Sequence, residues 1–294
     1  MRVSTNSMNS VLLAQTLNVQ SDYAKALNQQ SSELKSESLA GLSGQAGAVV
    51  SLQSDLKASE NLATKAKKAS SMVEIAYSSI TSIAEIVSKA KVEITAAISG
   101  TVSDVSNLVR DADNWLVDVQ TLLNVTMGGY SVFGGSGGQS KPVDMSLGGA
   151  TGSAYYQGSG TDWALMVDGS TPLTYGVRAD ATAFQTTITA LRSLSSMTST
   201  PDTETLQNIF DTFDSALTQL GKLQETLSDQ SDSLDSVIDA QTDFQLYAES
   251  ALDSVRAVDV AEATANASQI EVILKASYAA LSKVTNLSLT DYLR

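Results

Sequence analysis

The chain has 294 residues, of which 43% are hydrophobic, so it is long enough to bury a substantial core. Its 32 acidic residues outnumber its 18 lysines and arginines, and the net charge of −14 is the wrong sign for binding nucleic acid or an anionic membrane surface. Because the sequence contains no histidine and no cysteine, it excludes disulfides, Ser–His and Cys–His catalysis, and metal sites built on those side chains.

An apolar stripe marks residues 1–50. It is formed by Leu13, Leu17, Leu27 and Leu34. Steps of three and four residues, or their sums, predict one face of a helix. The segment 38–51 that follows is spaced by glycines, and we expect a soft joint there.

Residues 51–127 are predicted to form long helices. From Leu52 to Ile98, eleven of the fourteen positions at alternating steps of four and three are apolar. A continuous helix over 57–99 would be about 65 Å long at ~1.5 Å per residue. The pattern resumes after Gly100 and continues to Leu123.

Glycine is concentrated in the middle of the chain, where 13 of the 18 glycines lie within residues 128–180. Four short aromatic or β-branched segments lie in or at the edge of this region, at 130–133, 153–157, 163–167 and 173–177. Such segments, separated by turn residues, predict β-strands. We expect a small β-rich insert.

Residues 181–256 resume the helical pattern, with apolar positions from Leu206 to Ile238. Thr200 and Pro201 mark the start, because a hydroxyl caps the first turn and proline is tolerated there. We expect the helices before and after the insert to pack antiparallel as an elongated bundle.

The last region, 257–294, carries a second apolar stripe. It comprises Ile270, Leu274, Leu281 and Val284, and Leu287 and Leu289 extend it almost to the last residue. Asp259 and Glu262 have the spacing of a capping box, so we expect the helix to begin there. The two stripes at opposite ends of the chain are expected to form a pair of coiled-coil helices.

Neither a membrane span nor a cleaved signal peptide is visible. No uninterrupted apolar run approaches the ~18 residues of a membrane span. Near the start only 11–14 are continuously apolar, whereas a signal peptide needs about 7–15 such residues. We therefore expect no membrane insertion, and any export to proceed without a cleaved signal.

Two charged motifs allow a chemical interpretation besides a structural one. Asp111 and Asp113 could bind a cation, but they lie on a helical pattern without the glycine turn of a calcium loop. Lys65, Lys67 and Lys68 form either a solvated face or a contact to an acidic neighbouring subunit. We expect no metal site and no nucleic acid partner.

Two motifs of the insert are also open to a second interpretation. The stretch 134–138, Gly-Gly-Ser-Gly-Gly, could hold a phosphate, but no Lys-Ser/Thr follows it, which favours a flexible connector. Trp163, Tyr155 and Tyr156 could line a sugar-binding surface or form the core of the insert. We expect no cofactor.

Within residues 258–293, Asp-Val-Ala-Glu at 259–262 opens a helical pattern and Ser-Leu-Thr-Asp-Tyr-Leu closes it. The chain starts with "MRVST", and the passage 128–138 combines glycines with aromatic residues. These three segments resemble the hook-associated protein 3 family of bacterial flagella, which is related to flagellin. The sequence departs from the family at 29–47, where only Ser-Ser remains of the usual Leu-Ser-Ser-Gly segment.

The resemblance implies a three-part structural protein at the junction of hook and filament. Residues 1–50 and 257–294 would form the inner tube, 51–127 and 181–256 a helical rod, and 128–180 a surface insert. Two amphipathic helices with wide apolar stripes cannot bury both faces in one pair, so we expect the terminal stripes to form the assembly interface.

The resemblance also implies partners and a location. The partners would be neighbouring copies in a ring, hook-associated protein 1, flagellin, and the flagellar export apparatus with its chaperone. The location would be the extracellular flagellum. Three alternatives stay open: a flagellin that forms the filament, an adhesin-like module that binds through the insert, and an enzyme, for which no nucleophile–base pair is visible.

Overall fold

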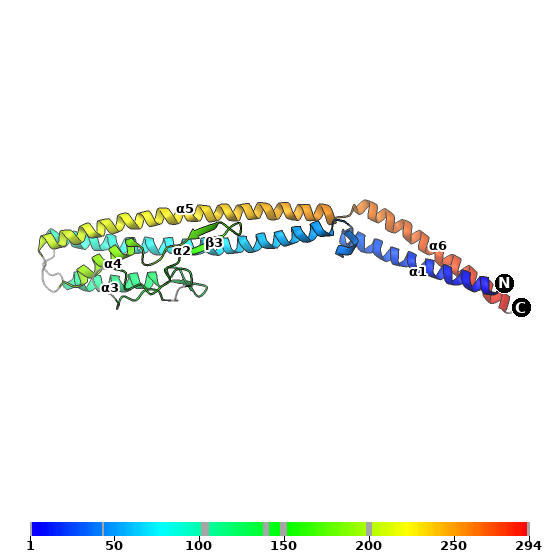
Figure 1. The fold of residues 1–294 in the computed structure, drawn as a ribbon, viewed down its shortest axis with the longest axis horizontal. Coiled ribbons are helices and arrows are strands. Elements are labelled where there is room, and N and C mark those ends of the chain that lie inside the picture. The colour runs from blue at the N-terminus through cyan, green and yellow to red at the C-terminus, as the bar shows by residue number, and fades with distance from the viewer. Residues whose placement is uncertain are drawn as a thin grey trace. The chain divides into compact units, whose positions relative to one another are not determined.

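The fold is shown as a computed structural model in Figure 1. The structure describes residues 2–42, 44–100, 106–137, 141–147, 152–197 and 202–292, without the side chains of 2–6, 9 and 285–292. The chain forms two compact units. The terminal unit consists of Met1–Ala58 and Phe244–Arg294, and the central unit of Ser59–Asp243.

Six α-helices dominate the described residues, which confirms the prediction of a mainly α fold with long antiparallel helices. They are α1 (Arg2–Ser32), α2 (Ala46–Ile98), α3 (Ser106–Leu123), α4 (Thr182–Ser195), α5 (Thr203–Arg256) and α6 (Val260–Tyr292), and a short 3-10 helix, η1, covers Leu39–Leu42. With 53 and 54 residues, α2 and α5 far exceed the mean helix of ~11–12 residues. None of the described helices combines the length and the apolar composition that crossing a membrane requires.

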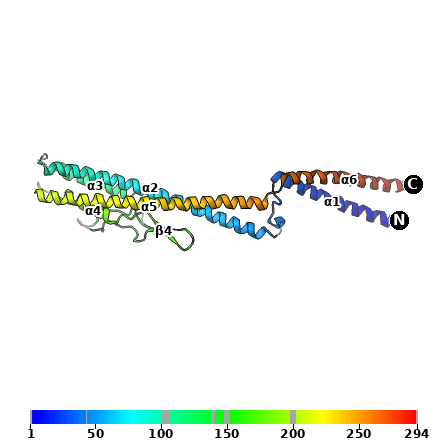
Figure 2. The ribbon, with the colours of Figure 1, turned by 90° about the horizontal axis from the view of Figure 1, so that it is seen from above.

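In the central unit, α2 and α5 run antiparallel along each other (Figure 2). Three contacts fix their register: Ser59 Oγ donates to the carbonyl of Gln241 (3.1 Å), Gln224 Nε2 donates to Thr81 Oγ1 (2.9 Å), and Lys91 pairs with Asp214. Moving from Ser59 to Lys91 along α2 thus corresponds to moving backwards from Gln241 to Asp214 along α5.

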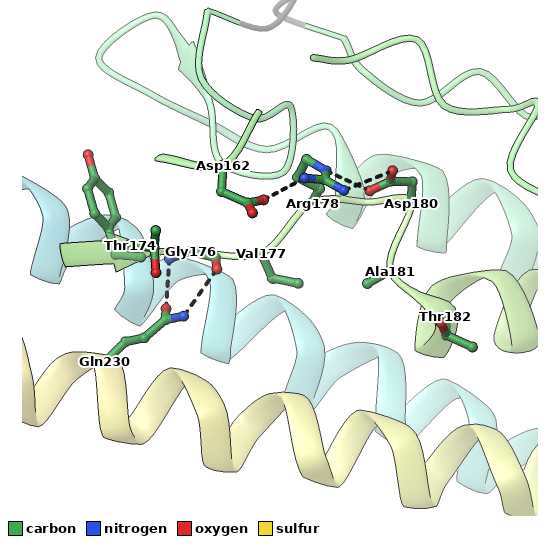
Figure 3. A pocket seen from close by; sticks show the side chains of 10 residues that line it. Asp162, Thr174, Gly176, Val177, Arg178, Asp180, Ala181, Thr182 and Gln230 are labelled. Carbon is green, nitrogen blue, oxygen red and sulfur yellow. Dashed lines mark hydrogen bonds and ion pairs between the residues drawn. The ribbon is translucent and has the colours of Figure 1, made fainter. Parts of the chain in front are cut away.

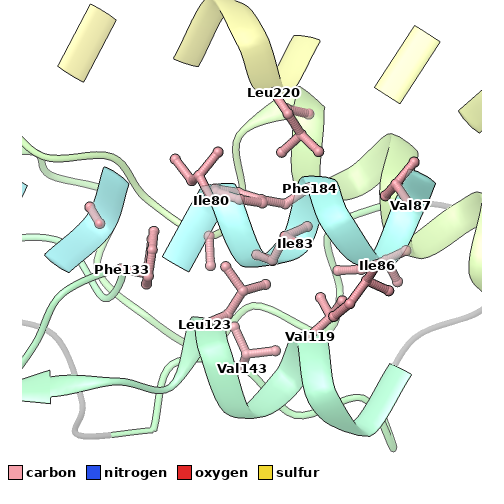
Figure 4. Close-up of a cluster of buried hydrophobic side chains, with 14 of the residues drawn as sticks. Ile80, Ile83, Ile86, Val87, Val119, Leu123, Phe133, Val143, Phe184 and Leu220 are labelled. Carbon is pink, nitrogen blue, oxygen red and sulfur yellow. The ribbon is translucent and has the colours of Figure 1, made fainter. Parts of the chain in front are cut away.

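The core of the central unit lies where the long helices meet α3, α4 and the insert. Ile80 and Ile83 of α2, Phe184 of α4 and Leu220 of α5 are fully buried there (Figure 4). The ring of Phe133, from the insert, meets Phe184 edge-on with 5.7 Å between centroids. Since each such side chain contributes about 1.5–3 kcal/mol on burial, this cluster holds the insert against the helices.

The insert contains two antiparallel hairpins. The first joins β1 (Thr126–Met127) to β2 (Tyr130–Ser131), and the positive φ angles of Gly128 (58°) and Gly129 (87°) fit the tight turn that a two-residue hairpin requires. The second joins β3 (Trp163–Met166) to β4 (Pro172–Tyr175).

Hydrogen bonds within its turn shape the second hairpin. Asp168 Oδ1 accepts from the backbone N–H of Thr171 (2.6 Å) and of Ser170 (2.9 Å). These bonds hold the pKa of the Asp168 carboxyl well below its usual value. The turn is therefore fixed by a side chain of its own.

The structure corrects one of the four predicted strands and shortens another. Residues 153–157 do not form a strand, because the Tyr156 N–H donates to the Ser153 carbonyl (2.9 Å) and turns the chain. Tyr156 makes only an isolated bridge to Val143. Of 130–133 only the first two residues are paired, whereas the predictions at 163–167 and 173–177 overlap β3 and β4.

In the terminal unit, α1 and α6 pack antiparallel along each other (Figure 1). A short backbone tie joins their bases, where Leu34 and Ala257 form an antiparallel bridge. The Lys35 N–H donates to Arg256 O (2.7 Å), and the Val258 N–H donates to Glu33 O (2.9 Å). These bonds bring together two segments more than 200 residues apart in sequence.

The predicted soft joint over 38–51 is shorter than expected. Residues 39–42 form η1, and α2 already begins at Ala46. The reason is that Val49 is buried against Leu42 and Leu252 in a small second core, which rewards helix formation from Ala46 onward.

Aspartates cap two helices. Asp259 Oδ1 accepts from the N–H groups of Ala261 (2.9 Å) and Glu262 (3.3 Å), so the predicted start of α6 at Asp259 is confirmed. At α5 the cap is Asp202, whose Oδ1 accepts from the Thr205 N–H (2.7 Å). The predicted capping pair, Thr200 and Pro201, lies outside the described residues.

Candidate functional site

The seam between α1 and α6 is built from small and polar side chains as well as apolar ones. On α1, Thr16 and Ala26 are buried, and Thr16 Oγ1 donates to the Leu12 carbonyl (2.8 Å) within its own helix. On α6, Ala263 and Ala267 are buried. Alanines let two helices approach closely but remove little apolar surface from water, so this seam is thin.

The stripe predicted on α6 is the one that faces inward. Leu274 is only 9% exposed, and Ile270, Leu281 and Val284 are half-buried. The side chains of Leu287 and Leu289 lie outside the described residues, although their backbone continues α6. Ile270, Leu274, Leu281 and Val284 therefore line the seam between α1 and α6 within a single chain.

The stripe predicted on α1 does not face α6 but is exposed. Leu13, Leu17 and Leu27 are 49%, 56% and 41% exposed, while the shielded positions of α1 come one residue earlier along each turn, at 12, 16, 19, 23 and 26. Leu34 follows α1, is half-buried and belongs to the backbone tie. The face of α1 that packs against α6 is thus offset by one residue from the predicted stripe.

The exposed leucines leave an apolar surface on the helix pair. Large apolar side chains that are exposed on α1 and α6 are Met8, Val11, Leu13, Leu17, Leu27, Val260, Val272, Ile273 and Tyr278. Isolated exposed apolar residues are normal, but so many on two paired helices indicate an interaction surface. Because about half of each side chain is already covered, a partner that buried the rest would add roughly half of the ~1.5–3 kcal/mol that a fully exposed side chain contributes on burial. We call Leu13, Leu17 and Leu27 the α1 outer face.

A second candidate is a polar cavity of about 360 Å³ between the insert and α5 (Figure 3). Arg178 occupies it, with Nη1 2.7 Å from Asp162 Oδ1 and Nε 2.9 Å from Asp180 Oδ1. These two carboxylates raise the pKa of the guanidinium, with the hydrogen bond to Asp180 contributing most. The cation of this cavity is therefore already paired within the chain.

The cavity's amide group is also engaged. Gln230 of α5 accepts a hydrogen bond from the Gly176 N–H at 2.7 Å and donates to the Gly176 carbonyl at 3.5 Å (Figure 3). This pair of bonds fastens β4 to α5. The strongest polar groups of the cavity are therefore hydrogen-bonded within the chain, and the bonds of Gln230 hold the insert against α5.

The aromatic motif of the insert divides into core and surface. Tyr155 is fully buried, and its hydroxyl donates to the Ala179 carbonyl (2.8 Å). Trp163 lies between Tyr175, stacked at 6.4 Å, and Tyr130, edge-on at 6.0 Å. Tyr130 is 62% exposed, so the outward part of the cluster is a residue that the sugar-binding hypothesis did not include.

The other charged and glycine motifs have structural explanations. Within the described residues no group of three acidic side chains is placed to hold a metal ion, and Asp111 lies near Arg110 (3.8 Å). Gly135 has φ +68°, and a Cβ there would lie 2.7 Å from the carbonyls of Ser159 and Thr161. Close backbone approach explains this glycine. Gly138 lies outside the described residues.

Comparison with known proteins identifies similar folds. No protein-family model matches the sequence, and no curated protein sequence matches it. FlgL from Bacillus cereus superposes with a TM-score of 0.57 and 14% identity over 69% of this chain and 99% of that one. A protein described as a flagellar hook-associated protein from Vibrio parahaemolyticus gives 0.61 and 10%, over 74% of this chain and 100% of that one. The fold is thus that of these flagellar proteins.

Proposed function

We propose that the chain is a structural subunit of the bacterial flagellum that joins hook to filament and assembles with copies of itself through α1 and α6. The observation that carries the proposal is the fold shared with FlgL from Bacillus cereus over 99% of that chain. The sequence resemblance at residues 258–293 is an independent argument for the same family. The proposal assigns no catalysis, no metal and no cofactor.

The helix pair supports assembly on physical grounds. A thin seam leaves the α1 outer face in water, and packing of several copies would bury it. Because Ile270, Leu274, Leu281 and Val284 line the seam within one chain, the contacts between copies are expected to involve mainly the α1 outer face. Leu287 and Leu289 would extend the interface at the end of α6.

The proposed partners and location follow from this role. Copies of the chain would form a ring, with hook-associated protein 1 on the hook side and flagellin on the filament side. The chain would reach the outside through the flagellar export apparatus, escorted by a chaperone that covers the exposed apolar surface until assembly. No membrane insertion is part of the proposal.

Immunogold labelling of isolated flagella tests the proposal. An antibody against the chain is expected to give one narrow band where the hook meets the filament. Decoration along the whole filament would instead identify a flagellin, and absence of label from flagella that are otherwise intact would reject a flagellar role.

A binding role for the insert is a second candidate. The observation that favours it is the exposed ring of Tyr130 against Trp163, since aromatic surfaces are common at sugar-binding and peptide-binding sites. The full-length protein should then bind members of a glycan array, and Tyr130→Ala should abolish that binding. Equal signals for the two proteins would reject this role.

A further inference from the structure

The central unit carries two exposed clusters of opposite charge at the same level of the rod. Lys65, Lys67 and Lys68 are exposed on α2, and three of the chain's 18 basic residues thus lie within four positions. We call these three the lysine patch. On α5, an exposed acidic stripe comprises Glu225, Asp229, Asp232, Asp239 and Asp243.

The acidic stripe is continuous and unneutralised along its own helix. Its members recur at steps of four, three, seven and four residues, which places them on one face of a helix. Between Lys222 and Arg256 the sequence contains no lysine or arginine. The stripe therefore presents a run of negative charge about 27 Å long at ~1.5 Å per residue.

The register between α2 and α5 places the two clusters at the same level along the two helices. Lys65 lies six residues along α2 from Ser59, and Asp235 lies six residues before Gln241, the hydrogen-bond partner of Ser59. The lysine patch is thus level with the middle of the acidic stripe, between Asp232 and Asp239. Despite this common level, the ion pairs found among the described residues involve neither cluster.

We infer that the lysine patch of one copy docks against the acidic stripe of a second copy lying parallel beside it. This inference rests on the proposed assembly of copies into a ring. Because the chain carries a net charge of −14, copies repel each other over most of their surface, and a basic patch is where close approach costs least.

The common level also specifies how the copies are arranged. A parallel neighbour without axial offset brings its acidic stripe to the height of the lysine patch, whereas a shift along the rod axis would lower the number of facing opposite charges. Such a face-to-back contact repeats from copy to copy and closes into a ring if the rotation between copies closes. The contact therefore fixes the height of neighbouring copies.

Cross-linking of full-length chains tests this arrangement. The sequence contains no cysteine, so single thiols can be placed freely. Ser71→Cys, beside the lysine patch, and Ser236→Cys, beside the acidic stripe, are both exposed positions. The pairing of Ser59 with Gln241 puts them about seven residues, or ~10 Å, apart along the helices. Ser215→Cys is an exposed control on the same helix, about 30 Å further along at ~1.5 Å per residue.

A mixture of the Ser71→Cys and Ser236→Cys chains, at high protein concentration and low salt, should give several-fold more heterodimer with a short thiol cross-linker than a mixture of Ser71→Cys and Ser215→Cys. The excess should fall steeply at about 1 M salt, where charges are screened beyond ~3 Å. Equal yields from the two mixtures would overturn the inference.

Reversing the charges of the two clusters provides a second test of the docking. Lys65→Glu, Lys67→Glu and Lys68→Glu together on the Ser71→Cys chain should abolish the excess. Asp229→Lys, Asp232→Lys and Asp239→Lys on the Ser236→Cys chain should restore it, with the circular dichroism of each variant confirming that its helices are intact. A yield unaffected by reversal overturns the docking, even if immunogold places the chain at the hook. A reversible cross-link without flagellar label keeps the docking and rejects the flagellar role.

Discussion

The two units bury different kinds of side chain. The core of the central unit contains large side chains such as Phe133, Phe184 and Leu220, each fully buried. The seam of the terminal unit relies on Thr16, Ala26 and their alanine neighbours on α6. Both units are helical, so helix content says little about where the stability resides. It resides where large apolar surface leaves water, which is mainly in the central unit.

The strongest test of this contrast is Phe184→Ala in the central unit. Phe184 is fully buried and meets Phe133 edge-on, so its truncation leaves a cavity and should cost about 3–5 kcal/mol of unfolding free energy. Urea denaturation followed by tryptophan fluorescence measures the loss, because Trp115 and Trp163 both lie in this unit. A loss below about 1 kcal/mol would mean that the site is not a packed core.

In the terminal unit, Leu274→Ala should cost less, roughly 2 kcal/mol, because the thin seam can close around the gap. The matched control is Leu13→Ala on the α1 outer face, which should change the stability of the isolated chain by less than about 0.5 kcal/mol. Amide hydrogen exchange in α1 and α6 measures both. If the control cost as much as the seam variant, the α1 outer face would be buried in the single chain.

Asp259→Ala tests whether the cap of α6 matters to the terminal unit. The substitution leaves the N–H groups of Ala261 and Glu262 without their acceptor and should destabilise the start of α6 by about 1 kcal/mol. Faster exchange of the first amides of α6 would record it. Asp259→Asn retains a side-chain acceptor and should behave like the original protein, so an equal loss in both variants would contradict the capping argument.

Of these effects, alkaline pH is expected to cause the smallest loss of unfolding free energy, and the loss falls on the central unit. Burial, and after it the charge of Asp180, raises the pKa of Tyr156 to about 12. An unfolded phenol has a pKa of about 10, so this contribution is full below pH 10 and is lost as the pH rises through 12. At about pH 11 we expect a loss of 0.5–1 kcal/mol after allowing for solvent screening.

Tyr156→Phe separates this effect from general alkaline denaturation. Comparing the pH dependence of urea midpoints between the two proteins measures the contribution of the phenol. Identical pH profiles would show that the Tyr156 phenol titrates alike in the folded and unfolded chain.

The long helices could be predicted from sequence because their apolar spacing repeats over many turns. The same method gave the wrong partner face on α1, where Val11, Leu12 and Leu13 are consecutive and two faces of the helix are apolar. Spacing alone does not say which of two apolar faces meets α6. The choice depends on the tertiary fit of Thr16 and Ala26, which no periodicity reveals.

The structure of the insert was harder to predict from the sequence, because hydrogen bonds between residues far apart in the chain shape it. Asn124 donates to and accepts from the backbone of Val143, at 2.8 and 2.9 Å, across 19 residues. Gln230 holds Gly176 across 54 residues. Neither residue has a local signal, so these two contacts of the insert were invisible in the sequence. The capping Asp259 was predictable because its bonds span only two and three residues.

The backbone tie between Leu34 and Ala257 fixes the position of α1 along α6. A helix seam of small side chains tolerates sliding, because alanine against alanine looks much the same after a shift of one turn. The tie does not tolerate sliding, because the Lys35 N–H donates to Arg256 O and the Val258 N–H donates to Glu33 O, and a shift along the helices would break both bonds. The position of α1 along α6 is therefore fixed, so that in the proposed assembly every copy would present the same alignment of side chains.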